Sequence, residues 1–174
     1  MRITSGHARR IGRLFPGSRD DKFQFNIPVM RSPVEQISAA PIAHLHYYEE
    51  YRLATWHPQG VVDDELIDRL VELVESEEVI AKGPFNRFVD LTGITNIRLQ
   101  FGHAFRIAQR RRANYPWREP IKSAFFCTWP IGYGFARMYE SLMSGGPIHV
   151  RAFRTREAAA EWLGVPVDVL LPEA

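Results

Sequence analysis

The side chains best suited to chemistry fall in four predicted turns, each of which follows a predicted strand. They are His57, Asp90, Thr92, Thr95, Asn96, Trp129, Tyr133 and Arg154. The carboxyl ends of parallel strands meet at one edge of a sheet, so we expect these turns to converge there, at what we call the strand-end rim. Asp90 could serve as a general base, but the sequence fixes no partner group for it.

Ligand binding is the second chemistry that these turns allow. The helix that follows each turn would present free N–H groups and the positive end of its dipole, which suits a small anion. Trp129 and Tyr133 could add an apolar wall. The same residue types are also common turn formers and helix caps, and the sequence alone favours that structural interpretation.

Metal, phosphate and thiol chemistry find less support. His44 and His46 would share one face of a strand, but a metal site needs a third ligand that the sequence does not fix. The glycines of "IGYGFA" lack the Gly-Lys-Ser/Thr ending of a phosphate loop. The only cysteine, Cys127, lies in the apolar run "SAFFCTW" and is interpreted as a small buried residue. We therefore predict no metal, no cofactor and no disulfide, and a cytoplasmic location.

Alternating strand and helix patterns must position the turns. Strands are predicted over 42–48, 51–57, 86–91, 121–129 and 148–153, and helices over 61–76, 97–114, 131–144 and 156–164. The order β-β-α-β-α-β-α-β-α indicates an α/β fold with mostly parallel strands. If the parallel strands follow sequence order, their crossover helices lie on one face. The other face would then need cover from the N-terminal arm, the last helix or a second subunit.

Apolar stripes define the inner faces of these helices. The second helix is predicted to bury Ile97, Phe101, Ala104, Phe105 and Ala108, and the third to bury Ile131, Phe135, Met138, Tyr139 and Leu142. The last helix is predicted to begin after an N-cap at Thr155 and to end at Gly164.

Composition points to one soluble globular domain. The chain has 174 residues, 45% hydrophobic and 24% charged, with a net charge of +2. Residues 1–43 lack periodicity and are predicted to form a partly disordered arm ahead of a domain over 44–174. Residues 63–78 carry eight acidic side chains and one basic, while 98–122 carry seven basic and one acidic. We interpret both as solvated outer faces, and with Phe101 and Phe105 assigned to the core, we expect no nucleic-acid partner.

Four stretches together carry a resemblance to a known superfamily. They are "YRLATWHPQGVVDDELIDRLVELV", "FNRFVDLTGITNI", "GYGFARMYESLM" and "IHVRAFRTREAAAEWLG". Their joint order resembles the STAS/SpoIIAA-like superfamily, and especially its small bacterial STAS-like members of unassigned function. The resemblance implies a sheet of about five strands, mostly parallel, with an antiparallel leading strand. It also implies a helix start that carries a phosphorylated serine in the anti-sigma-factor antagonists. Here Arg98 and Leu99 occupy roughly that place, so we predict that this switch is absent.

Three functions remain open on this basis. The first is a non-enzymatic module that binds a partner protein, or a small anionic or apolar ligand, at the strand-end rim. The second is a small enzyme of unknown reaction that uses Asp90, His57 and Thr92 at the same rim. The third is a homodimeric interaction protein whose arm covers the sheet of its partner.

Overall fold

A computed structural model describes residues 45–172, which belong to one compact unit of the chain. The strands are β1 (Leu45–Tyr48), β2 (Leu53–Trp56), β3 (Gly60–Asp63), β4 (Asn86–Asp90), β5 (Ile94–Arg98), β6 (Ile121–Phe126) and β7 (Ile148–Phe153). The helices are α2 (Asp64–Ile80), α3 (Phe101–Ala113), α4 (Pro130–Met143) and α5 (Arg156–Leu163), with short 3-10 helices η1 (Glu49–Tyr51), η2 (Leu91–Gly93) and η3 (Val167–Leu170). The predicted arm over 1–43 lies outside the described residues. Within the described range, no helix combines the length and the apolar character needed to cross a membrane.

The main sheet has five strands in the order β1-β2-β4-β6-β7. β1 runs antiparallel to β2, and the other neighbours are parallel. This confirms the predicted mixed sheet with an antiparallel leading strand. The nearly continuous apolar sequence of β6 fits its interior place, because an interior strand covered on both faces presents no side to water.

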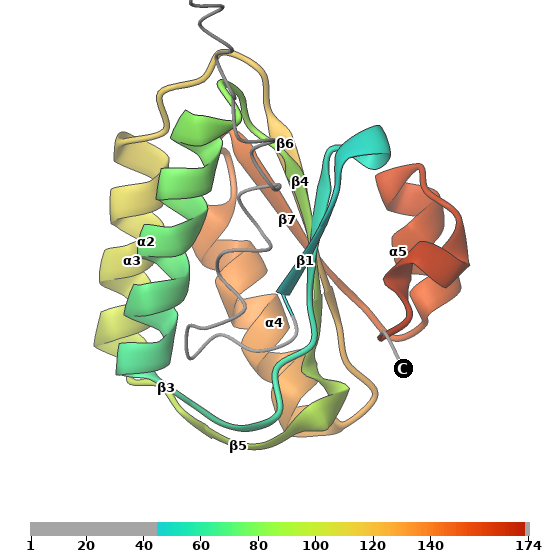
Figure 1. The fold of residues 1–174 in the computed structure, drawn as a ribbon. Helices are drawn as coiled ribbons and strands as arrows, with labels where there is room; N and C mark the ends of the chain where they lie inside the picture. Colours follow the sequence, from blue (N-terminus) through green and yellow to red (C-terminus); the bar gives the residue numbers. More distant parts are fainter. Residues whose placement is uncertain (1–44, 173–174) are drawn as a thin grey trace, which may run out of the picture. The chain divides into compact units, whose positions relative to one another are not determined.

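Helices cover the two faces of this sheet unequally (Figure 1). α2, α3 and α4 lie on one face, and α5 lies on the other. On the α5 side, Phe88 and Ala124 from the strands pack with Ala159 and Leu163 from the helix, and Leu170 of η3 completes the cluster. The sequence left three candidates to cover this face: the N-terminal arm, the last helix and a second subunit. The structure shows that the last helix covers it.

Helix ends follow the sequence signals. Asp63 caps α2 by accepting a hydrogen bond from the Leu66 N–H at 2.9 Å. The Thr155 hydroxyl accepts one from the Ala158 N–H at 3.3 Å, which confirms the predicted cap of α5. Gly164 ends that helix with φ +80°, a conformation that favours glycine.

A second, two-stranded sheet was not predicted. β3 and β5 pair in parallel and lead from the strand-end rim into the first turns of α2 and α3. Both segments are short, and Gly60 at the start of β3 has φ +77°. Glycine and the polar pair Thr95 and Asn96 are typical of loops, so the sequence pattern did not predict that β3 and β5 pair.

Two predicted apolar stripes were partly wrong. Phe101 and Phe105 are 62% and 43% exposed and stack on each other with ring centroids 6.5 Å apart. The buried face of α3 is instead formed by Ala104, Ile107, Ala108 and Arg111. In α4, Ile131 is 74% exposed, and the buried residues are Gly132, Ala136 and Met143. The argument against nucleic acid that placed Phe101 and Phe105 in the core therefore no longer holds.

Two glycines of α4 offer a matched test of packing between this helix and the turn before it. A Cβ at Gly132 would lie 2.6 Å from both Cys127 Sγ and the Trp129 ring, whereas a Cβ at Gly134 would meet nothing within 4 Å. We expect Gly132→Ala to lower the free energy of unfolding by about 1–3 kcal/mol through overpacking. Gly134→Ala should raise it by up to about 1 kcal/mol through helix propensity. Urea titration measures both, and equal effects of the two substitutions would contradict this packing.

Candidate functional site

Asp90 is the centre of one polar cluster at the strand-end rim. It lies at the end of β4 and is only 3% exposed. The N–H and the hydroxyl of Thr92 donate to its Oδ1 at 2.9 and 2.6 Å, and Arg156 of α5 donates to its Oδ2 at 2.6 Å. His57 Nδ1 lies 3.6 Å from the same Oδ2. The structure therefore brings three of the predicted site residues together, with an arginine that sequence reasoning did not include.

These contacts keep the Asp90 carboxyl ionised. Burial alone would raise its pKa, but the nearby His57 ring and the hydrogen bonds from Thr92 and Arg156 outweigh burial and hold the pKa well below its usual range. A carboxylate with such a low pKa is a poor proton acceptor near neutral pH. The cluster is therefore better suited to joining β4 to α5 than to general base catalysis.

His57 is held mainly by apolar surroundings. It is 6% exposed, and its ring lies 5.9 Å from that of Phe88. Within residues 45–172 neither ring nitrogen has a partner that meets hydrogen-bond geometry, and the Asp90 contact is longer than a hydrogen bond. The imidazole is thus oriented toward a carboxylate but closed off from solvent.

Trp129, Tyr133 and Arg154 form a separate group around the turn between β6 and α4. Trp129 Nε1 donates to the Leu91 carbonyl at 3.2 Å, which ties this turn to η2. The Arg154 guanidinium lies 3.8 Å from the centre of the Tyr133 ring and donates to the Thr128 carbonyl at 2.8 Å. These side chains already have partners within the protein.

Thr95 and Asn96 are not drawn into either group. Both are exposed on β5. Among the described residues, no hydrogen bond or ion pair joins them to Asp90. Nor does the described part of the chain gather three His, Cys, Asp or Glu side chains in a way that could hold a metal ion. His44 of the histidine pair lies outside that part.

A cavity that the sequence did not reveal lies on the face of the sheet that α2, α3 and α4 cover, opposite α5. It has a volume of about 110 Å³, is partly open to the surface and is lined by residues of α2, α3, α4 and the sheet. Its lining is mainly apolar, with Ile67, Leu70, Val71, Val74, Ala104, Ile107 and Phe135 among the helical contributions. An apolar cavity of about 150 Å³ can bind benzene. The space here is therefore of the order that one small ring or short branched chain requires.

Strand register gives the cavity two different ends. Trp56, Val89 and Phe125 are Cα partners across β2, β4 and β6 and form an apolar row toward the strand-end rim. Two residues earlier in the strands, Arg87 and Ser123 are Cα partners on the same face. The cavity is thus apolar toward the rim, and its polar strand residues lie toward the amino ends of the strands, beside Val150 and Ile148 of β7.

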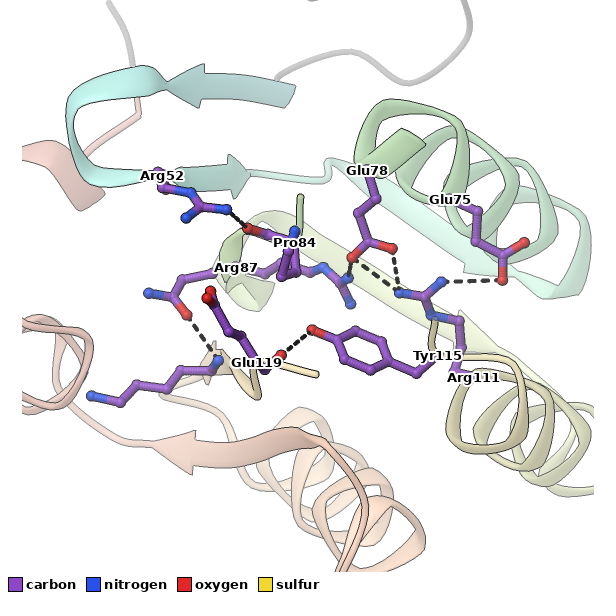
Figure 2. A network of polar contacts seen from close by, with 10 residues as sticks. Arg52, Glu75, Glu78, Pro84, Arg87, Arg111, Tyr115 and Glu119 are labelled. Atoms are coloured by element: carbon purple, nitrogen blue, oxygen red, sulfur yellow. Dashed lines mark hydrogen bonds and ion pairs between the residues drawn. The ribbon is translucent and has the colours of Figure 1, made fainter. Parts of the chain in front are cut away.

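Five charged side chains meet near this end, and we call them the charged cluster: Glu75, Glu78, Arg87, Arg110 and Arg111. Figure 2 shows four of them, Glu75, Glu78, Arg87 and Arg111. Glu78 of α2 binds Arg87 of β4, and it binds Arg111 of α3 at 3.2 Å. Glu75 binds Arg110, and it binds Arg111 at 3.1 Å. Glu78 and Arg111 are 2% and 6% exposed. The acidic and basic runs therefore pair across the two helices, and their assignment to solvated outer faces was wrong for Glu78 and Arg111.

The charged cluster also affects its neighbours electrostatically. Burial lowers the pKa of Arg87, and repulsion from Arg111 lowers it further, while Glu78 opposes both effects. Burial raises the pKa of Tyr139, which lines the same end of the cavity, and Arg87 and Arg111 oppose that rise. These two arginines thus lie close enough to act on groups at the cavity wall.

Comparison with known proteins gives a likeness in fold. No family model matches the chain, and no curated protein matches it. Among solved structures, the chain is similar to the crystal structure of an uncharacterized protein of the DUF3478 family from Shewanella loihica PV-4, described as having a SpoIIAA-like fold. The match has a TM-score of 0.45 and 14% sequence identity, and it covers 68% of this chain and 89% of that one.

Proposed function

We propose that this protein is a non-enzymatic ligand-binding module, without a phosphoserine switch, whose ligand is a small apolar molecule held in the cavity under α2, α3 and α4. The observation that carries the proposal is the cavity itself, with its apolar wall and its single polar end. Sites for small molecules commonly combine these two features.

The energetic cost of the cavity supports the proposal. An enclosed apolar cavity destabilises a protein by about 24 cal/mol per Å³, so about 2–3 kcal/mol is the upper bound for this partly open space of 110 Å³. Larger side chains at Val71, Val74 or Ala104 would remove this cost. The protein keeps a space that lowers its stability and that single substitutions could fill. Ligand binding explains such a space better than folding stability does.

The strand-end rim is less suited to binding a ligand, because most of its polar groups already have partners within the protein. The Asp90 carboxylate already accepts three hydrogen bonds, and Trp129 and Arg154 use their donors on backbone carbonyls. The enzyme hypothesis required Asp90, His57 and Thr92 to approach a common point. The point that they approach is the Asp90 carboxylate, which already has its hydrogen bonds, and the His57 ring beside it is closed off from solvent. Binding at the rim stays a prediction from the sequence.

Toluene is a suitable first probe because it is ring-sized and uncharged. A ligand at ten times its Kd stabilises the folded state by about 1.4 kcal/mol, which should raise Tm by about 3–5 °C in a chain of this size. We expect Ala104→Leu, which fills the cavity wall, to abolish this rise. Ala113→Leu on the exposed face of the same helix is the control and should retain it. Equal responses of the two variants, or no response of the wild type, would refute the proposal.

A further inference from the structure

The charged cluster has more positive than negative charge. Its ion pairs join three arginines to two glutamates, which leaves a formal excess of one positive charge. Arg110 is half exposed, so water screens part of its charge. Arg87 and Arg111, by contrast, are 15% and 6% exposed and share the almost fully buried Glu78. The excess positive charge therefore acts most strongly on the cavity side of the cluster, where water screens it least.

Arg87 also has unused hydrogen-bonding capacity. Its guanidinium binds Glu78, but its buried Nε–H has no acceptor within the described residues. An unsatisfied buried donor costs free energy, and the cost is greater when the donor is charged. Arg87 lines the cavity next to its Cα partner Ser123, which also lines it. Among the described residues, the Arg87 guanidinium thus has one anionic partner, Glu78, and one buried donor that could bind a second acceptor.

From this arrangement we infer the class of ligand: a small apolar monocarboxylate, whose body fills the apolar end of the cavity and whose carboxylate binds at Arg87. This inference rests on the proposed function. A carboxylate matches the planar fork of an arginine, and it would neutralise the excess charge. The single negative charge of one carboxylate matches the excess of one positive charge in the cluster. The volume suits a body of about the size of one ring.

The cost of removing a carboxylate from water sets a condition on this ligand. A buried anion is tolerated only where it is paired and hydrogen-bonded. At the apolar end, bounded by Trp56, Val89 and Phe125, a carboxylate would find no partner. The head group is therefore confined to the end near Arg87, which fixes the orientation of the ligand.

Benzoate and nitrobenzene make a matched pair of probes, because they have nearly the same shape but only benzoate is charged at pH 7. Calorimetric titration should show that wild-type protein binds benzoate about 10–100-fold more tightly, as expected for hydrogen bonds to a charged group. In Arg87→Met this preference should fall to near one, while the affinity for nitrobenzene stays within about threefold. Glu78 retains Arg111 as a partner in this variant.

The outcomes separate the two proposals. If wild-type protein binds both probes equally, the carboxylate class is wrong and the cavity function stands. If it binds neither, both are wrong. If the preference for benzoate persists in Arg87→Met, the assignment of the head group to Arg87 is wrong. Should that variant fail to fold, the Arg87 Nε–H resonance of the wild type decides: benzoate must shift it and nitrobenzene must not.

Discussion

Glu78→Gln is expected to lower the free energy of unfolding by about 3–5 kcal/mol. The carboxylate is 2% exposed and binds both Arg87 and Arg111, so its loss leaves Arg87 without an anionic partner among the described residues, while Arg111 keeps only Glu75. Removing one partner from a buried ion pair costs about this much, because the remaining charge is uncompensated. Chemical denaturation at pH 7 measures the change. Glu72→Gln on the exposed face of the same helix is the control and should stay within about 0.5 kcal/mol of wild type.

A triple variant separates charge from packing in this result. Glu78→Met combined with Arg87→Met and Arg111→Met removes all three charges and keeps side chains of similar length. Buried ion pairs can often be replaced by apolar groups with little loss, so the triple variant should recover most of the stability that Glu78→Gln loses. If Glu78→Gln were as stable as wild type, the charged cluster would not be a buried one.

Asp90→Asn is expected to cost about 2–3 kcal/mol at neutral pH, since it removes a charged acceptor from Thr92 and Arg156. The pKa of Asp90 is lower in the folded state than the usual value of about 3.9 for an unfolded chain. Its contribution is therefore fully present above that unfolded value and is lost as the pH falls through the lower, folded value. The difference between Asp90→Asn and wild type should accordingly shrink as the solution becomes more acidic.

Thermal unfolding between pH 7 and pH 2 measures this dependence. The matched control is Asp168→Asn, an exposed aspartate in η3, which should change stability little across the range. A constant difference between Asp90→Asn and wild type at every pH would show that Asp90 contributes shape and not charge.

Sequence patterns predicted the main sheet and its helices because long, periodic segments determine them. The caps at Thr155 and Gly164 were also readable, because local hydrogen bonding and backbone conformation decide such ends. The inner face of α3, in contrast, was not predicted correctly. The predicted stripe was counted from Ile97, which belongs to β5, so the helical register began too early and placed Phe101 and Phe105 inside.

The cavity could not be predicted, because an unfilled volume depends on how helices sit on a sheet and leaves no trace in periodicity. A signal of its polar end was nevertheless present. Arg87 stands in a buried strand, Glu78 falls four residues after Val74 on the inner stripe of α2, and Arg111 falls four after Ile107 on that of α3. Charged residues at inward positions predict a buried polar site. The excess of charge around them suggested solvent-exposed faces instead.

Intermolecular nuclear Overhauser effects between toluene and the protein test the central claim most directly, because they locate the ligand. We predict contacts from the toluene ring to Val89 and Phe125 of the sheet and to Ile107 of α3, with none to Thr92 or Tyr133. Contacts confined to those two rim residues, or no intermolecular contacts at saturating toluene, would contradict the account.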